Sequence, residues 1–379
     1  MAAARTLRGL LWNDDEDRPR AIWRLGLAAV LLLVGGIAGV ALASGLVALA
    51  PSTAPPTVVA LVTVAARTLE MAGFVGGILA AAWLIDRRRL VDLGLGRSRD
   101  WWADLAFGLA LGVALPALVF ALELAAGFLR VTGTLVSRAD PSLAVGPGVP
   151  VALALALTFA FFVGVGLFEE LLFRGYLLTN VAEGLDGWLG VGRRGALAGA
   201  TAVSSLAFAV GHGMNPNVTP LAVANIALFG GLFAASYLLT ERIAVAVGVH
   251  VTWNFSIASV FGFPVSGFTT PATVVAVEQS GPELVTGGSF GPEGGLVTLV
   301  AFVAGATALA WWVRLREGAL RWRAAVARPT LRRSERADHR SDAAADADSD
   351  GPGTADVDDE TADTADGDAA TGGPEPDTE

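Results

Sequence analysis

Long apolar runs without charge alternate along the chain with short breaks rich in arginine, glycine or proline. A transmembrane helix needs about 20 consecutive, mostly apolar residues, and eight such runs can be recognised. We therefore predict an all-α, polytopic protein of the cell membrane with about eight transmembrane helices. The predicted spans lie near residues 21–50, 58–85, 102–129, 150–173, 195–213, 218–240, 242–262 and 294–313.

The composition supports a membrane protein and excludes chemistry that depends on cysteine. Hydrophobic residues make up 53% of the 379 residues and charged residues 16%, whereas an ordinary soluble domain is about 25% charged. We expect membrane lipid as the surrounding partner and no nucleic-acid partner. The chain has no cysteine, which excludes disulfides, thiolate metal ligands and a cysteine nucleophile.

Charge is unevenly distributed and predicts how the chain threads the membrane. All 26 basic residues are arginine, and nearly all of them fall in segments that lie on one side of the predicted bundle. The predicted loops of the opposite side contain only Arg130 and Arg138. Because positively charged residues are concentrated on the cytoplasmic side of membrane proteins, we predict that both termini are cytoplasmic.

The chain divides into a membrane body and polar ends. Residues 341–379 hold 14 of the 36 acidic residues and no arginine, and so little apolar surface predicts disorder. The acidic, lysine-free composition is typical of a salt-loving, halophilic prokaryote. We predict a solvated cytoplasmic arm at 1–20, N-terminal transmembrane helices at 21–100, a catalytic membrane core at 101–262, an outer loop at 263–293, a last transmembrane helix with a basic flank at 294–327, and a disordered acidic tail at 328–379.

Residues 166–176 concentrate charge where the chain is otherwise apolar. Glu169, Glu170 and Arg174 follow a run, 151–168, that contains no charged residue. A charge at the centre of a transmembrane helix costs roughly 2.5–3.5 kcal/mol on insertion scales, and such residues are usually functional. Glu170 and Arg174 are four residues apart, in the order that favours an intrahelical ion pair. This segment is the centre of the candidate site, and a polar network that only packs helices is the plainer alternative.

Two further pairs of residues lie in apolar stretches at helical spacing. His212 comes four residues after Phe208, and His250 four residues before Asn254, so each pair shares a helix face. Counted from the predicted inner helix ends at 1.5 Å per residue, His250, Asn254, Glu169 and His212 lie at depths of ~12, ~18, ~20 and ~26 Å, a spread that helix tilt and uncertain helix ends largely cover. We therefore predict that these side chains meet in the inner-to-middle part of the bilayer.

These residue types suit hydrolysis by an activated water. A carboxylate whose pKa is raised by burial can act as a general base near neutral pH. Imidazole can share a water with it, and Asn and His side chains can donate hydrogen bonds to an oxyanion. The HExxH pattern of zinc proteases is missing and no Ser–His–Asp set is evident. The residues favour water activated by Glu and His, with or without a metal.

The order of these motifs resembles a known family. The motifs are Glu169-Glu170-x-x-x-Arg174, Phe208-x-x-x-His212 and His250-x-x-x-Asn254, each on a separate predicted span. Together they resemble the CPBP family of intramembrane proteases, which includes CAAX-type prenyl endopeptidases and bacteriocin-processing, Abi-like proteins. The resemblance covers roughly residues 100–262.

The resemblance implies roles for the individual residues. Glu169 would be the base that activates water, and His212 would help to hold that water. His250 and Asn254 would stabilise the oxyanion, and Glu170 with its arginine would give structural or electrostatic support. The resemblance also implies a peptide or lipidated protein as substrate, either a prenylated C-terminus or a leader peptide.

Some alternatives stay open at this point. The family is conventionally described as metalloproteases, and Glu169, His212 and His250 could together hold zinc, but the same residues also serve a metal-free glutamate mechanism. A non-proteolytic scaffold or immunity protein of the same fold is the second hypothesis for the function. An ion-coupled or proton-coupled transporter is the third, although we find none of the repeat symmetry that such proteins favour.

Other polar and aromatic residues of the predicted spans receive no catalytic role. Arg67 and Glu70, three residues apart in the second predicted span, are interpreted as an ion pair. The ten tryptophans fall mainly near span ends, which predicts anchors at the membrane interface.

Overall fold

The structure, a computed structural model, describes residues 9–14, 16–138, 143, 145, 148–328 and 331–332. In this part of the chain, seven helices are long and apolar enough to cross a membrane. They are α2 (Ala21–Ala48), α3 with its π-helical end η1 (Pro56–Ile85), α4 (Arg99–Ala125), the continuous α5–η3–α6 (Val151–Leu185), α7 (Arg193–Gly211), α8 (Pro220–Thr240) and α11 (Val297–Glu317). The remaining predicted span is a shorter apolar helix, α9 (Ala244–Phe255) continued by the π-helical turn η5 (Ser256–Val260). The predicted all-α, multi-pass membrane fold is confirmed.

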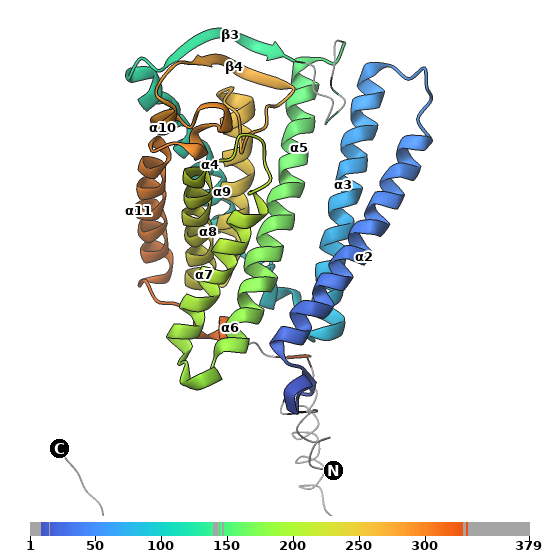
Figure 1. Ribbon diagram of the computed structural model, residues 1–379, viewed down its shortest axis with the longest axis vertical. Coiled ribbons are helices and arrows are strands. Elements are labelled where there is room, and N and C mark those ends of the chain that lie inside the picture. Colours follow the sequence, from blue (N-terminus) through green and yellow to red (C-terminus); the bar gives the residue numbers. More distant parts are fainter. Residues whose placement is uncertain are drawn as a thin grey trace, which may run out of the picture. The chain divides into compact units, whose positions relative to one another are not determined.

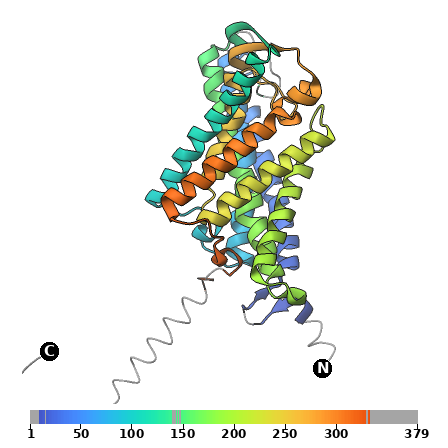
Figure 2. The same ribbon diagram turned by 90° about the vertical axis from the view of Figure 1, so that its left-hand side faces the viewer.

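The helices gather around α5. In Figure 1, α2 and α3 run antiparallel on one side of α5, and the other helices lie on its opposite side. The view in Figure 2 shows α4 and α11 side by side, crossing the bundle obliquely. Helix α9 contacts both α4 and α5, so it lies inside the bundle, and every residue from Ala244 to Trp253 is buried.

Close packing of glycines seats α9 against α4. A Cβ on Gly108 of α4 would lie 2.4 Å from the carbonyl oxygen of Val245, and one on Gly248 of α9 would lie 2.7 Å from that of Leu105. Only glycine allows two helix backbones to approach this closely, and small residues commonly form helix interfaces in membranes. This interface fixes the depth and rotation of α9, and therefore the position of the site residues that α9 carries.

A two-stranded antiparallel sheet replaces part of the predicted outer loop. Strand β3 (Leu129–Ser137) pairs antiparallel with β4 (Ala272–Gln279), and both lie across one end of the bundle (Figure 1). The third span was predicted to reach residue 129, but α4 ends at Ala125 because Gly127 turns the chain with a φ of 73°. Because the apolar strand β3 begins only a few residues later, the hydropathy pattern shows one continuous apolar run, and the predicted span was extended into the strand.

The predicted solvated arm at 1–20 is wrong at Arg18, which is 1% exposed. Its guanidinium bonds Glu183 of α6 at 3.1 Å, and Arg88 bonds the same carboxylate at 2.6 Å. The acidic tail, with His339, lies outside the described residues apart from three positions. The remaining short elements are β1 (Trp12–Asn13), β2 (Arg18–Pro19), η2 (Leu90–Leu93), η4 (Trp188–Gly190), α10 (Glu283–Thr286), η6 (Gly288–Phe290), η7 (Pro292–Gly294) and η8 (Ala324–Ala327).

Candidate active site

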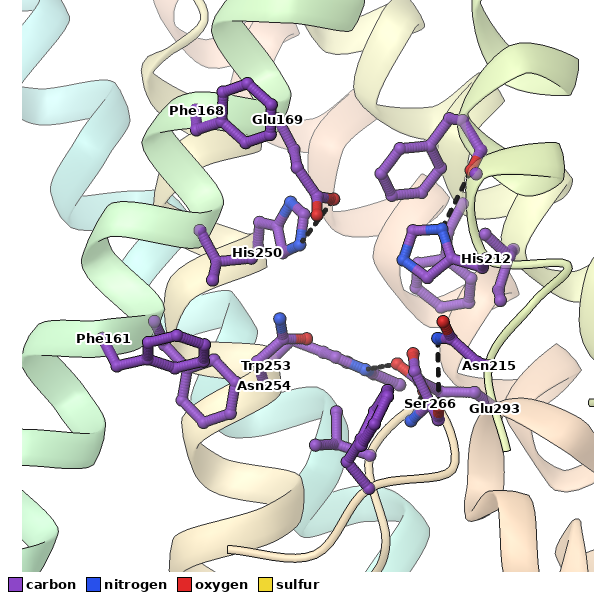
Figure 3. A pocket seen from close by; sticks show the side chains of 18 of the residues that line it. Phe161, Phe168, Glu169, His212, Asn215, His250, Trp253, Asn254, Ser266 and Glu293 are labelled. Atoms are coloured by element: carbon purple, nitrogen blue, oxygen red, sulfur yellow. Dashed lines mark hydrogen bonds and ion pairs between the residues drawn. The ribbon is translucent and has the colours of Figure 1, made fainter. Parts of the chain in front are cut away.

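A cavity of about 680 Å³ lies within the bundle and brings the motifs together. Glu169, His212, His250 and Asn254 all line it, and their side chains face a common space in Figure 3. Nine Phe and Trp side chains also line it: Phe161, Phe162, Phe168, Phe173, Phe208, Phe229, Phe233, Trp253 and Phe268. The site is therefore a mainly apolar chamber with a small number of polar groups, as is usual for binding sites.

Glu169 and His250 lie next to each other in the wall of the cavity. Their nearest atoms, Glu169 Oε2 and His250 Nε2, lie 3.7 Å apart. The Glu169 side chain is 20% exposed, whereas that of His250 is 6% exposed. Glu169 Oε2 has no hydrogen-bond donor among the described residues. One water within hydrogen-bonding distance of both atoms would fit this separation.

Glu170 and Arg174 lie behind His250 and do not line the cavity. Both side chains are fully buried, with Arg174 Nη1 2.9 Å from Glu170 Oε1. The same Glu170 oxygen lies 2.8 Å from His250 Nδ1. Because a carboxylate accepts hydrogen bonds, Nδ1 carries a proton and donates, which leaves Nε2 facing Glu169. Glu170 thus sets the orientation and tautomer of His250.

Aromatic rings enclose this buried charge pair. The Arg174 guanidinium lies 4.4 Å from the ring centroid of Phe208 and 5.2 Å from that of Phe233. The Phe233 ring also stacks on the His250 imidazole at 5.8 Å. Cation–π contacts of this kind stabilise a desolvated cation. Phe208 therefore packs against the charged part of the site.

The helix that carries the carboxylates changes its winding at the site. The α-helical α5 ends at Glu170, and the next eight residues, Leu171–Leu178, form the π-helix η3. Wider π-helical turns inside α-helices frequently occur at functional sites. The sequence predicted one regular helix here, because hydropathy does not distinguish the two windings.

His212 lies on the opposite wall. It caps the C-terminal end of α7, and its Nδ1 is 2.9 Å from the carbonyl oxygen of Phe208. A carbonyl only accepts hydrogen bonds, so Nδ1 donates and Nε2 is the remaining acceptor of a neutral ring. Figure 3 shows His212 across the cavity from Glu169 and His250. The structure brings Glu169, Glu170, Arg174 and His250 into one contact chain, with His212 facing that chain rather than joining it.

The predicted zinc ligands do not gather as a metal site. Within the described parts of the chain, no group of three or more His, Cys, Asp or Glu side chains could hold a metal ion. Glu169 and His250 approach each other, but His212 stays on the facing wall. A structural or catalytic zinc needs at least three protein ligands at about 2.0–2.3 Å. The arrangement of these three side chains does not fit zinc.

Sequence reasoning missed another carboxylate that lines the cavity, Glu293, which lies beside Ser266 in Figure 3. Its Oε1 accepts a hydrogen bond from the Trp253 indole at 2.9 Å. Its Oε2 accepts from the Ser266 backbone N–H at 2.6 Å and from the Ser266 hydroxyl at 2.7 Å. Glu293 thereby ties α9 to the turn that crosses the cavity. A charged residue within the Gly291–Gly295 stretch was the available signal.

The turn over the cavity spans Val265–Phe268. The backbones of Val265 and Phe268 hydrogen-bond each other in both directions at 2.8 and 2.9 Å, and Asn215 donates to the Ser266 carbonyl at 3.0 Å. Gly267 has a φ of 87°, and a Cβ there would lie 2.0 Å from the Pro216 carbonyl oxygen. A residue with a side chain cannot occupy this position without moving the turn.

Comparison with known proteins supports the resemblance inferred from the motifs. Residues 151–256 match the family described as Type II CAAX prenyl endopeptidase Rce1-like. All three motifs fall within the matched residues, so the match confirms the predicted resemblance and supports membership of the CPBP family. No curated protein matches the chain in a sequence comparison.

Proposed function

We propose that this CPBP-type membrane protein is an endopeptidase that hydrolyses a peptide bond with a water activated by Glu169. The observation that supports the proposal is the pairing of Glu169 Oε2 with His250 Nε2, 3.7 Å apart, at the edge of an apolar cavity. In the neutral tautomer of His250 in which Nδ1 donates to Glu170, Nε2 and the Glu169 carboxylate are both acceptors and can hold one water between them. We assign the proton transfer to the carboxylate, which is the more exposed of the two to the cavity.

The proposed reaction begins with proton transfer to Glu169. The carboxylate removes a proton from the water as its oxygen attacks the carbonyl carbon of the substrate. His250 keeps the water in place, because its ring is fixed by the hydrogen bond to Glu170.

Asn254 is proposed to stabilise the tetrahedral intermediate. Its side chain lines the cavity one helical turn after His250, and its amide N–H can donate to the oxyanion that forms. As the intermediate collapses, Glu169 returns its proton to the leaving amine, so the carboxylate is regenerated and one water is consumed. His212, on the facing wall, is placed to contact the substrate or the attacking water through Nε2.

The proposed substrate is an apolar or lipidated peptide. The eight phenylalanines that line the cavity favour a hydrophobic occupant over a polar peptide. The name of the matched family points to a prenylated C-terminus, and a leader peptide is the other candidate that the resemblance implies.

Glu169→Gln tests the proposal, because it keeps shape and hydrogen bonding while removing the base. The full-length protein and the variant are each incubated with membranes from cells that lack the protein, and new peptide termini are identified by mass spectrometry. Termini produced by the original protein should fall by about 10²–10⁴-fold with the variant. In H₂¹⁸O, each new carboxyl terminus should contain one ¹⁸O atom.

The control is that the variant remains folded and still binds the substrate so identified. Equal cleavage by both proteins would show that Glu169 is not the base. If neither protein produced new termini, the scaffold hypothesis would take precedence.

A further inference from the structure

The two ends of the bundle differ in charge, which gives the protein a direction in the membrane. Helices α2, α4, α7 and α9 begin, and α3, α8 and α11 end, at the end where α6 lies, opposite β3 and β4 (Figure 1). The connections at that end are rich in arginine, with three in succession at 87–89. At the end with β3 and β4, the described chain contains only Arg130, which pairs with the exposed Glu278, and Arg138. Because arginines are concentrated on the cytoplasmic side of membrane proteins, the end with β3 and β4 corresponds to the outer side.

The cavity extends from Glu169 toward this outer end. Its wall includes Asn215 from the connection between α7 and α8, and Ser266 and Thr269 from the segment between η5 and β4. Thr269 is exposed, and Phe268, another lining residue of the same segment, is 53% exposed. These side chains reach both the cavity and the surface, so the cavity opens at the outer end.

An apolar layer closes the cavity on its other side. Along the helix that carries Glu169, no described residue after Phe173 lines the cavity. Leu178, at the end of η3, is 0% exposed and belongs to a buried cluster with Leu93 and Ile243. The last two residues lie in the connections at the arginine-rich end. The floor of the cavity is therefore packed with apolar side chains.

A buried ionic layer follows the apolar one. Asn180 donates to Asp86 Oδ2 at 2.8 Å and accepts from Arg24 Nε at 2.9 Å. Arg88 donates to Glu183 at 2.6 Å. The side chains of the first three residues are at most 2% exposed, and charge-assisted hydrogen bonds of this kind are strong. A substrate on the arginine-rich side would have to cross both layers to reach the site.

We propose that the site takes its substrate and its water from the outer side of the membrane. The substrate is then a polypeptide segment exposed on that side, either in an exported protein or in an outer segment of a membrane protein. The proposal rests on the proposed function, and it favours the leader-peptide candidate over a C-terminus at the cytoplasmic face. The polar residues at the opening suit a hydrated peptide backbone, and the aromatic walls deeper in the cavity suit apolar side chains.

Cysteine accessibility tests the direction of the opening. The chain has no cysteine, so a single introduced thiol gives the whole signal. Thr269→Cys reports on the opening, Leu172→Cys on the inner part of the cavity, and Leu189→Cys, at an 81% exposed position of η4, on the arginine-rich end. A sulfonated, membrane-impermeant methanethiosulfonate is applied to right-side-out and to inside-out membrane vesicles that contain each full-length variant. An independent marker protein verifies the orientation of the vesicles.

The two cavity positions should be modified from the outer side. We expect Thr269→Cys and Leu172→Cys to react at least about tenfold faster in right-side-out vesicles, because a charged reagent crosses the bilayer core poorly. Leu189→Cys is the matched control and should show the opposite preference. Glu169→Cys repeats the measurement at the proposed base itself, in case Leu172→Cys does not fold. Faster reaction of the inner cavity position in inside-out vesicles, or reaction from neither side, would overturn the proposal.

The positions of new peptide termini test the substrate class. Intact cells that produce either the original protein or the Glu169→Gln variant are compared by mass spectrometry. Termini that depend on Glu169 should fall in exported proteins or in outer segments of membrane proteins. Termini confined to cytoplasmic segments would overturn the substrate class and leave the peptidase assignment intact. Modification of Leu172→Cys from the outer side without any such termini would support the outward opening and count against the peptidase.

Discussion

His250 is held by Glu170, not by Glu169. Its Nδ1 lies 2.8 Å from Glu170 Oε1, whereas its Nε2 lies 3.7 Å from Glu169 Oε2. The two adjacent carboxylates therefore have different tasks. The fully buried Glu170 orients the imidazole, and the partly exposed Glu169 remains available to the cavity. The two glutamates are the same residue type and adjacent in the sequence, so their different roles must come from their different surroundings in the fold.

Glu170 and Arg174 should be strongly coupled in stability. Removing one partner of a buried ion pair leaves an uncompensated charge and typically costs about 3–5 kcal/mol. We expect Arg174→Gln and Glu170→Gln each to lower the unfolding temperature of the purified protein. The double variant should be less destabilised than the sum of the two, because it leaves neither charge unpaired.

A matched comparison is available at the surface. Arg130→Gln breaks the exposed pair with Glu278 and should change stability by no more than about 1 kcal/mol. Strictly additive effects of the Glu170 and Arg174 substitutions would contradict the coupling seen in the structure. Glu170→Gln should also reduce turnover, because it alters the hydrogen bond that orients His250.

Asn254→Ala should lower turnover and spare substrate affinity. The contact proposed for Asn254 strengthens only as negative charge develops on the substrate oxygen, so its loss should reduce kcat by about 10²–10³-fold. KM should change little, which steady-state kinetics on an identified substrate would measure. Asn215→Ala is the control, because Asn215 lines the same cavity but donates to the Ser266 carbonyl. A raised KM with unchanged kcat for Asn254→Ala would assign it to substrate binding instead.

Glu293→Ala should loosen the turn at 265–268. The substitution leaves the Trp253 indole and the Ser266 N–H without their acceptor, and each unsatisfied buried donor costs about 1–3 kcal/mol. We expect faster proteolysis within the turn and a lower unfolding temperature. Glu293→Gln, which keeps an acceptor oxygen, should show a smaller effect.

Ser266→Ala distinguishes the two hydrogen bonds that Ser266 makes to Glu293, one from its hydroxyl and one from its backbone N–H. It removes the hydroxyl bond to Glu293 but keeps the backbone bond, so the turn should remain protected. Equal protection of the turn in the Glu293→Ala variant and the unsubstituted protein would mean that the turn is held mainly by Asn215 and its own backbone.

Metal analysis tests the cofactor hypothesis directly. Because Glu169, His212 and His250 do not gather as ligands, we expect the purified protein to contain less than one equivalent of zinc. Exhaustive chelation followed by dialysis should leave both the unfolding temperature and any hydrolysis unchanged. The contrary result would be one equivalent of zinc whose removal by chelation abolishes activity and whose return restores activity. That result would require His212 to move toward Glu169.

Contacts between residues of the same helix could be predicted from the sequence, whereas contacts between different helices could not. The four-residue spacing of Glu170 and Arg174 correctly indicated an ion pair, as did the three-residue spacing of Arg67 and Glu70. That His250 bonds Glu170 depends on how α9 packs against α4 and α5, and helical spacing carries no information about that contact. The catalytic roles themselves stay predictions.

Features without a helical period were missed. Glu293 lies in a glycine-rich and proline-rich stretch that was interpreted as an outer loop, so its bonds to Trp253 and Ser266 could not be anticipated. Trp253 shows the same limit, because an indole inside a span donates to a carboxylate here instead of anchoring a membrane interface. Long-range hydrogen bonds of this kind depend on the fold as a whole.

The glycine interface between α4 and α9 bears on where an independent folding unit can begin. The family match starts at residue 151, yet Gly248 within it packs against the backbone of α4, which ends at Ala125. A fragment covering only 151–256 would contain every motif residue and lack the surface that seats His250. The shortest fragment able to fold with this site intact must therefore begin no later than Arg99, where α4 starts. The family match, which begins at residue 151, covers only part of the structure that folds as a unit.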